Sequence, residues 1–130
     1  MSYQTRKIAI IGAGHVGSHT GYSLVSQSLA DEIVYIDTDR EKAAAQALDL
    51  SDATKYLPSK VKVSAGDYAD IADAQLLIVA AGTLPDMNRG QTRMDTLRQT
   101  IAIIKEVTES IRMSGFAGII LNISNPADVV

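Results

Sequence analysis

Three glycines near the amino terminus have the spacing of a phosphate-binding turn. The hexapeptide Gly-Ala-Gly-His-Val-Gly begins at Gly12, directly after a short apolar run, and has the pattern G-x-G-x-x-G. Gly12 permits a tight turn, Gly14 lets a pyrophosphate approach the backbone, and Gly17 lets the following helix pack closely. The free amides at the start of that helix, which include those of His15 and Val16, would face the anion. The motif alone is weak, but its place between a predicted strand and a predicted helix indicates a dinucleotide site.

An acidic residue lies where such a site needs one. Asp37 follows Gly17 by twenty residues and ends the apolar run Glu32 to Ile36. A carboxylate there accepts hydrogen bonds from both ribose hydroxyls and would repel a 2′-phosphate, so NAD is favoured over NADP. The alternative is that the glycines only form a tight turn and that Asp37 only caps a helix.

The two histidines, His15 and His19, have the i, i+4 spacing of a helical metal pair. A metal site needs a third ligand, the sequence has no HExxH pattern, and it has no cysteine. We therefore expect no metal site, and neither histidine is expected to act as the acid–base group.

Short β-branched runs alternate with longer helical stretches along the chain. Asp39 is a predicted helix N-cap and Gly115 a predicted C-cap. The alternation predicts an α/β doubly wound parallel sheet, the Rossmann architecture, with helices on both faces. We expect strands at 7–11, 32–37, 61–65, 76–81 and 118–123, helices at 15–27, 39–53 and 91–114, and a helical turn at 67–72.

Length and composition limit the class of protein. The 130 residues suffice for one domain, and a net charge of −3 argues against a nucleic-acid partner. No apolar run approaches a membrane span, there is no signal-peptide architecture, and the lack of cysteine fits a cytoplasmic protein. A doubly wound sheet of this type has six strands. We expect residues 1–130 to be a dinucleotide-binding domain that lacks its sixth strand and a substrate domain.

The order of several short motifs resembles the L-lactate/malate dehydrogenase family, including the L-2-hydroxyisocaproate dehydrogenases. The similarity extends over the whole chain. The matching pieces are IIGAGHVG at 10–17, YID at 35–37, ALDLSDA at 47–53, AAG at 80–82, GQTR at 90–93, GF at 115–116 and NISNPADV at 122–129. The resemblance implies hydride transfer between NAD and the C2 atom of an L-2-hydroxy or 2-oxo acid.

The resemblance also assigns roles to individual residues. Ala80, Ala81 and Gly82 would lie along the cofactor. Arg93 matches the family's lid arginine, which polarises the substrate carbonyl; a guanidinium on a closing loop suits that task. Asn125 matches the asparagine near the nicotinamide ribose and the substrate. Without the resemblance, Arg93 would be an exposed arginine and Asn125 a turn residue before a proline.

The resemblance also implies that Met87, six residues before Arg93, occupies the position that discriminates substrates in the family. Lactate enzymes usually have glutamine there and malate enzymes arginine. Met87 offers no cation for a second carboxylate, which disfavours malate, and its flexible thioether suits lactate or a larger apolar 2-hydroxy acid. The loop is about two residues longer than usual in the family, so Arg89 is the second candidate for substrate contact.

The family's catalytic His–Asp pair and its carboxylate-binding arginine are expected beyond residue 130. The chain alone is then expected to bind NAD weakly and to be inactive. A stand-alone NAD-binding or sensing module without catalysis is the alternative, and an inactive fragment with an exposed sheet edge is a third possibility. The helix at 41–53 is implied to pack across a homo-oligomer axis, with simple core packing as the alternative.

Overall fold

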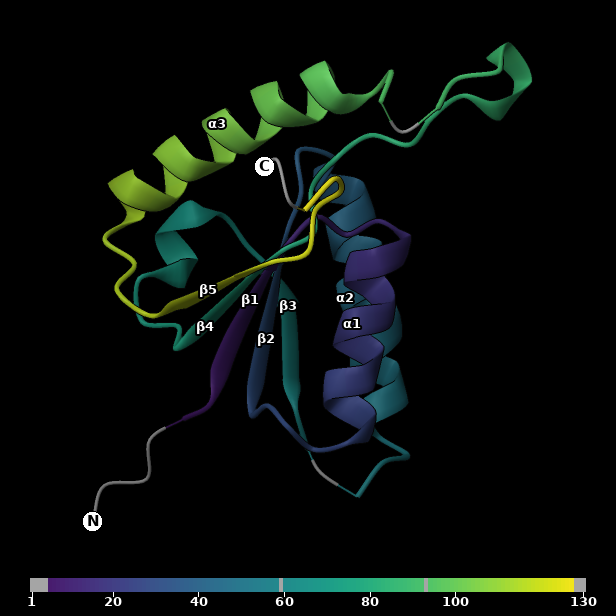
Figure 1. The fold of residues 1–130 in the computed structure, drawn as a ribbon. Coiled ribbons are helices and arrows are strands. Elements are labelled where there is room, and N and C mark those ends of the chain that lie inside the picture. The colour runs from purple at the N-terminus through teal and green to yellow at the C-terminus, as the bar shows by residue number, and fades with distance from the viewer. Residues whose placement is uncertain (1–4, 59, 93, 128–130) are drawn as a thin grey trace.

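A parallel five-stranded sheet with helices on both faces forms the protein (Figure 1). The computed structural model describes residues 5–58, 60–92 and 94–127. The strands are β1 (Lys7–Ile11), β2 (Glu32–Ile36), β3 (Lys62–Ala65), β4 (Leu76–Val79) and β5 (Ile119–Asn122). The α-helices are α1 (His15–Ser26), α2 (Arg40–Thr54) and α3 (Leu97–Ser114), with short 3₁₀ helices η1 (Tyr68–Ile71) and η2 (Met87–Arg89).

The strand order places the carboxyl ends of the central strands at the topological switch point. The order is β3-β2-β1-β4-β5, and every neighbouring pair is parallel. The chain first winds outward from β1 to β3 and then returns to pair β4 with the other side of β1. Ligands of open α/β sheets bind beside the carboxyl ends of the strands where this reversal occurs. The predicted doubly wound architecture is confirmed.

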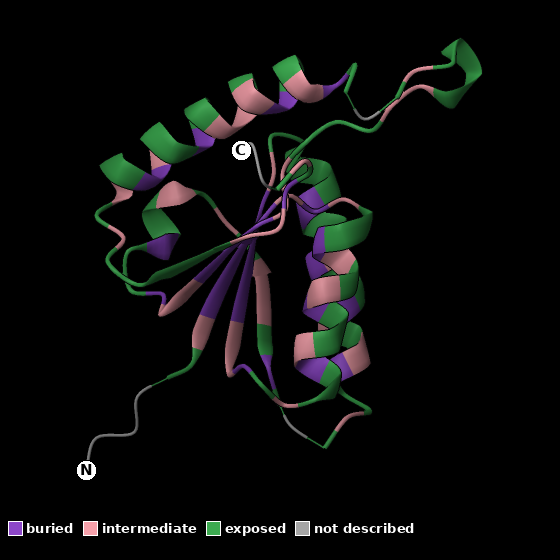
Figure 2. Ribbon diagram, viewed as in Figure 1, coloured by how far each residue is buried: buried purple, intermediate pink, exposed green. Residues whose placement is uncertain are grey.

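Alternate residues of the strands serve two apolar cores, one on each face of the sheet (Figure 2). Ile8 and Ile10 pack with the inner faces of α1 and α2, while Ala9 and Ile11 pack with α3 and η1. Such strands must be apolar on both faces, which explains their continuous hydrophobic runs. Within the described ranges, no helix is long and apolar enough to cross a membrane.

The last long helix begins later than the sequence predicts. The expected start near Gln91 is wrong, and α3 begins at Leu97. The carboxylate of Asp95 accepts hydrogen bonds from both the backbone N–H and the hydroxyl of Thr92, at 2.6 and 2.7 Å, and this local turn competes with helix formation. The other predicted boundaries agree within two residues.

Both predicted helix caps are confirmed. The side chain of Asp39 accepts a hydrogen bond from the backbone N–H of Lys42 at 3.0 Å and caps α2. Gly115 ends α3 in the left-handed conformation, with φ of +77°.

Candidate functional site

A cleft of about 450 Å³ lies at the carboxyl ends of the central strands. It brings together the glycine turn after β1, the end of β2 and the segment after β4. Six of the predicted cofactor residues line it: Gly12, Gly14, Asp37, Ala80, Ala81 and Gly82. They come from three separate parts of the chain, so the parallel sheet itself assembles the cleft.

The turn after β1 requires glycine for two separate reasons. Gly12 has φ of +102°, and a Cβ on it would lie 2.6 Å from the carbonyl oxygen of Ala80. A Cβ on Gly17 would collide with the carbonyl oxygen of Gly12, which confirms the close packing of α1 on β1.

Gly14 differs from these two because its space is open. The nearest atom to a Cβ built on Gly14 is Nζ of Lys42, at an ordinary contact distance of 3.7 Å. No contact in the described part of the chain therefore requires a glycine at this position for steric reasons. A bare backbone there matters only to a group that enters the cleft.

The amino end of α1 is open to an anion. Its N-cap is Gly14, which has no side chain to accept from the first amides, and its first turn holds no acidic residue. In contrast, α2 is capped by Asp39 and η1 by Asp67. The free amides and the positive end of the α1 dipole remain available to an anionic ligand.

Asp37 is tied to the glycine turn as well as to its own loop. Its Oδ2 accepts from the backbone N–H of Ala13 at 2.8 Å, and its Oδ1 accepts from the backbone N–H of Asp39 at 2.9 Å. The side chain stays partly exposed in the cleft. The carboxylate thus fixes the turn and still faces the ligand space.

Several lining residues were missed by the sequence analysis. Arg40 and Lys42 add two cations to the lining, with Lys42 beside Gly14, and neither has an ion-pair partner among the described residues. Their place just after Asp37 is a signal that could have found them.

The opposite wall is formed by Tyr68 of η1 and by Glu106 and Ser110 of α3. No sequence spacing indicates that these three residues belong to the cleft, because only the packing of α3 on η1 brings them there.

Other predicted residues lie apart from the cleft. The side chains of His15 and Val16 line a second, shallow hollow of about 540 Å³ on the outer face of α1. That hollow is lined by neither Gly12, Gly14 nor Asp37, so the cleft at the ends of the strands is the one that holds the predicted cofactor groups. His15 and His19 both lie on this surface, and the described residues contain no group of three or more side chains arranged to hold a metal ion.

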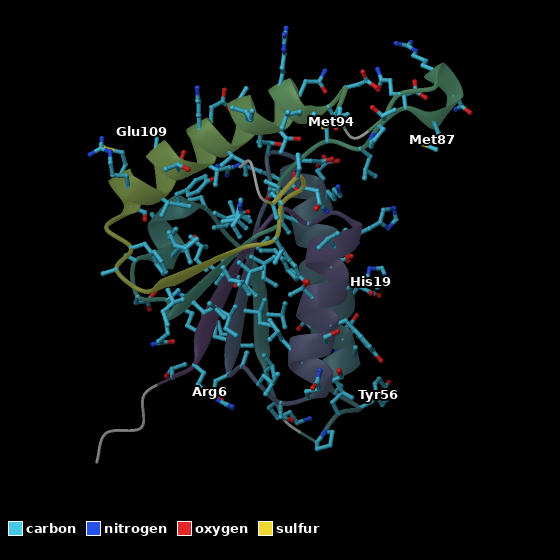
Figure 3. The ribbon with its side chains drawn as sticks, viewed as in Figure 1. Arg6, His19, Tyr56, Met87, Met94 and Glu109 are labelled. Atoms are coloured by element: carbon cyan, nitrogen blue, oxygen red, sulfur yellow. The ribbon has the colours of Figure 1, made fainter. Side chains whose placement is uncertain are left out.

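The predicted substrate residues that the structure describes, Met87, Arg89 and Asn125, do not line this cleft. Met87 is 80% exposed at the end of a loop that projects away from the sheet (Figure 3). Arg89, in the same short helix, forms an ion pair with Asp86 at 3.2 Å. Asn125 is exposed in the turn after β5. Arg93 lies outside the described residues.

Comparison with known proteins identifies the relatives of this chain. The family model described as "lactate/malate dehydrogenase, NAD binding domain" matches residues 6–130. L-lactate dehydrogenase 3 of Bacillus cereus is 42% identical over 130 residues, which is 100% of this chain and 40% of that protein. L-lactate dehydrogenase 1 of Staphylococcus aureus is 40% identical over 128 residues, 98% of this chain and 40% of the relative. The chain thus spans about 40% of the length of the curated relatives it matches.

Solved structures give the same result. The ligand-bound minor L-lactate dehydrogenase of Enterococcus mundtii superposes with a TM-score of 0.89 at 37% identity, covering 95% of this chain and 39% of that one. A lactate dehydrogenase from a deep-sea metagenome library superposes with a TM-score of 0.86 at 38% identity, again covering 95% of this chain and 39% of the other.

Proposed function

The chain belongs to the lactate/malate dehydrogenase family and forms its NAD-binding domain, and on that premise we propose that it serves an NAD-dependent L-2-hydroxy-acid dehydrogenase. The reaction would move a hydride between the nicotinamide ring and C2 of the acid. The observation that carries this proposal is one cleft holding an uncapped helix start, a bare Gly14 and the Asp37 carboxylate. The alternative, a stand-alone NAD-binding module, is disfavoured because the relatives are L-lactate dehydrogenases.

The residues of the cleft would hold the cofactor in a fixed direction. The amides at the start of α1 would bind the pyrophosphate beside Gly14, and the Lys42 ammonium would add a positive charge there. Asp37 would accept from the adenosine ribose hydroxyls. Ala80, Ala81 and Gly82, beside the switch point, would line the nicotinamide half. When bound, NAD supplies the hydride acceptor and NADH the donor.

The substrate would be a 2-hydroxy or 2-oxo acid without a second carboxylate. We assign carbonyl polarisation to Arg93, substrate and nicotinamide-ribose contact to Asn125, and side-chain discrimination to Met87. The exposed thioether of Met87 brings no cation to the substrate, and this supports lactate or a larger apolar acid over malate. The acid–base His–Asp pair and the arginine that binds the substrate carboxylate would come from outside these residues.

The polypeptide encoded by the complete gene tests this function. NADH oxidation is measured with pyruvate, with a branched 2-oxo acid and with oxaloacetate. We expect turnover of one or both of the first two and little with oxaloacetate, and Met87→Arg should raise the activity on oxaloacetate. NADH binding without turnover of any 2-oxo acid would favour the module, and preference for oxaloacetate would contradict the assignment of Met87.

We also propose that the protein is a cytoplasmic homo-oligomer assembled through α2. Ala43, Ala47 and Leu50 bury one face of this helix against the sheet, while Leu48 on another face is 65% exposed. An exposed leucine on a helix already anchored to the core suits contact with a second copy.

A further inference from the structure

The cleft continues past Asp37 to a wall that carries a carboxylate and two hydroxyls. Gly66 and Asp67 follow β3, Tyr68 begins η1, and Glu106 and Ser110 face the same space from α3. If the pyrophosphate lies at the start of α1 and the adenosine ribose at Asp37, the adenine base would lie against this wall. The inference below rests on that proposed placement.

The carboxylate of Glu106 is available to a ligand. It has no ion-pair partner among the residues that the structure describes. The Ser110 hydroxyl donates to the backbone carbonyl of Glu106 at 2.9 Å and not to its carboxylate. Glu109, one residue before Ser110, is by contrast paired with Arg112 at 2.6 Å.

The neighbourhood of Tyr68 supports the same position for Glu106. Burial raises the pKa of the Tyr68 hydroxyl, and the negative charge of Glu106 raises it further, against a hydrogen bond with Ser110 that lowers it. Glu106 and Tyr68 both line the cleft, which is the geometric basis for placing them together. Tyr68 is partly buried against the core that contains Val107, which gives this end an apolar wall for a flat ring.

We propose that Glu106 recognises the 6-amino group of the adenine base and makes it preferred over a 6-oxo purine. A carboxylate only accepts hydrogen bonds, and the exocyclic amine of adenine is the donor that the base offers. A hypoxanthine base has a carbonyl oxygen at the same position. Two acceptor oxygens, this one and the carboxylate, would then face each other and repel. The cleft would then have complementary charge at both ends, with Lys42 toward the phosphates and Glu106 toward the amine.

Titration with two cofactors tests this. The chain is titrated by nicotinamide fluorescence with NADH and with reduced nicotinamide hypoxanthine dinucleotide, which differ at the 6-position of the base. We expect the wild type to bind NADH about fivefold more tightly, the effect of one modest hydrogen bond. Glu106→Gln should bring the two affinities within about twofold, because an amide can accept from the amine and donate to the oxygen.

The matched control is Glu109→Gln on the same helix, whose side chain lies on the outer side of α3 (Figure 3). It should keep the wild-type preference. Equal affinities in the wild type, or an unchanged preference in a folded Glu106→Gln, would overturn the role of Glu106 while leaving NAD binding intact. Failure of the wild type to bind NADH at all would overturn the placement of the cofactor and this inference with it.

Discussion

The Asp37 carboxylate accepts a hydrogen bond from the backbone N–H of Ala13 at 2.8 Å and so joins the end of β2 to the glycine turn after β1. The residue expected to bind ribose thus also shapes the turn expected to bind phosphate. A carboxylate has about four lone-pair sites, so both tasks can be performed together. Substitutions at this position must therefore be interpreted for fold and for binding separately.

Two substitutions of Asp37 should separate these tasks. Asp37→Ala removes both acceptors and should lower the free energy of unfolding by about 1–2 kcal/mol and NADH affinity about tenfold or more. Asp37→Asn can still accept from Ala13, so its loss of stability should be smaller, while loss of the charge raises the NADPH-to-NADH affinity ratio. Urea unfolding measures the stability of each variant and fluorescence titration its cofactor affinities. The exposed Asp52→Asn is the control. Unchanged NADH affinity in Asp37→Ala would remove the ribose assignment.

Gly12→Ala should destabilise the fold by about 3 kcal/mol or more, because strain at positive φ is added to a clash. The added Cβ would lie 2.6 Å from the Ala80 carbonyl oxygen. Gly90→Ala is the matched control: Gly90 also has positive φ, +65°, but no contact within 4 Å of its Cβ position is found among the described residues. Gly90→Ala should lower the free energy of unfolding, measured with urea, by only about 1 kcal/mol. Equal losses in the two variants would show that the close approach of the turn to β4 is unimportant.

Tyr35 should make stability fall at high pH. Burial raises the pKa of Tyr35 to about 12 from 10.0, so the folded state holds its proton more tightly than the unfolded state. Its contribution is complete below pH 10 and is lost as the pH rises through about 12. The free energy of unfolding, measured with urea between these pH values, should decline as the pH rises. Tyr35→Phe should reduce this decline. Tyr22→Phe, at a tyrosine that is 57% exposed, should leave the decline unchanged; a decline equally steep in Tyr35→Phe would refute the assignment.

Leu48→Glu should shift the protein toward the monomer. Leu48 is 65% exposed on α2, so the glutamate causes little strain in the subunit itself but places a charge in the proposed interface. Sedimentation velocity across a concentration series measures the change. Leu84→Glu, at a leucine that is 80% exposed outside α2, is the control. A Leu48→Glu protein with the same mass distribution as wild type would rule out this face.

The glycine turn, Asp37 and the cap at Asp39 could be predicted because each is set by residues close in sequence. Glycine spacing follows from the strand-turn-helix geometry, and an N-cap acts within three residues. Tyr68, Glu106 and Ser110 could not be predicted, because only tertiary packing of α3 on η1 brings them to the cleft. The start of α3 was missed for a local reason, since the Thr92–Asp95 turn overrides helix propensity. The roles of Arg93, Met87 and Asn125 remain predictions.

Gly14→Ala tests the central claim, that a bare stretch of main chain at the start of α1 receives the pyrophosphate. Among the described residues, only Lys42 Nζ approaches the new Cβ, at 3.7 Å, so there is room for it. The free energy of unfolding should change by about 1 kcal/mol or less. NADH affinity, measured by fluorescence titration of the same samples, should fall about tenfold or more. A folded Gly14→Ala protein that binds NADH as tightly as wild type would contradict the account.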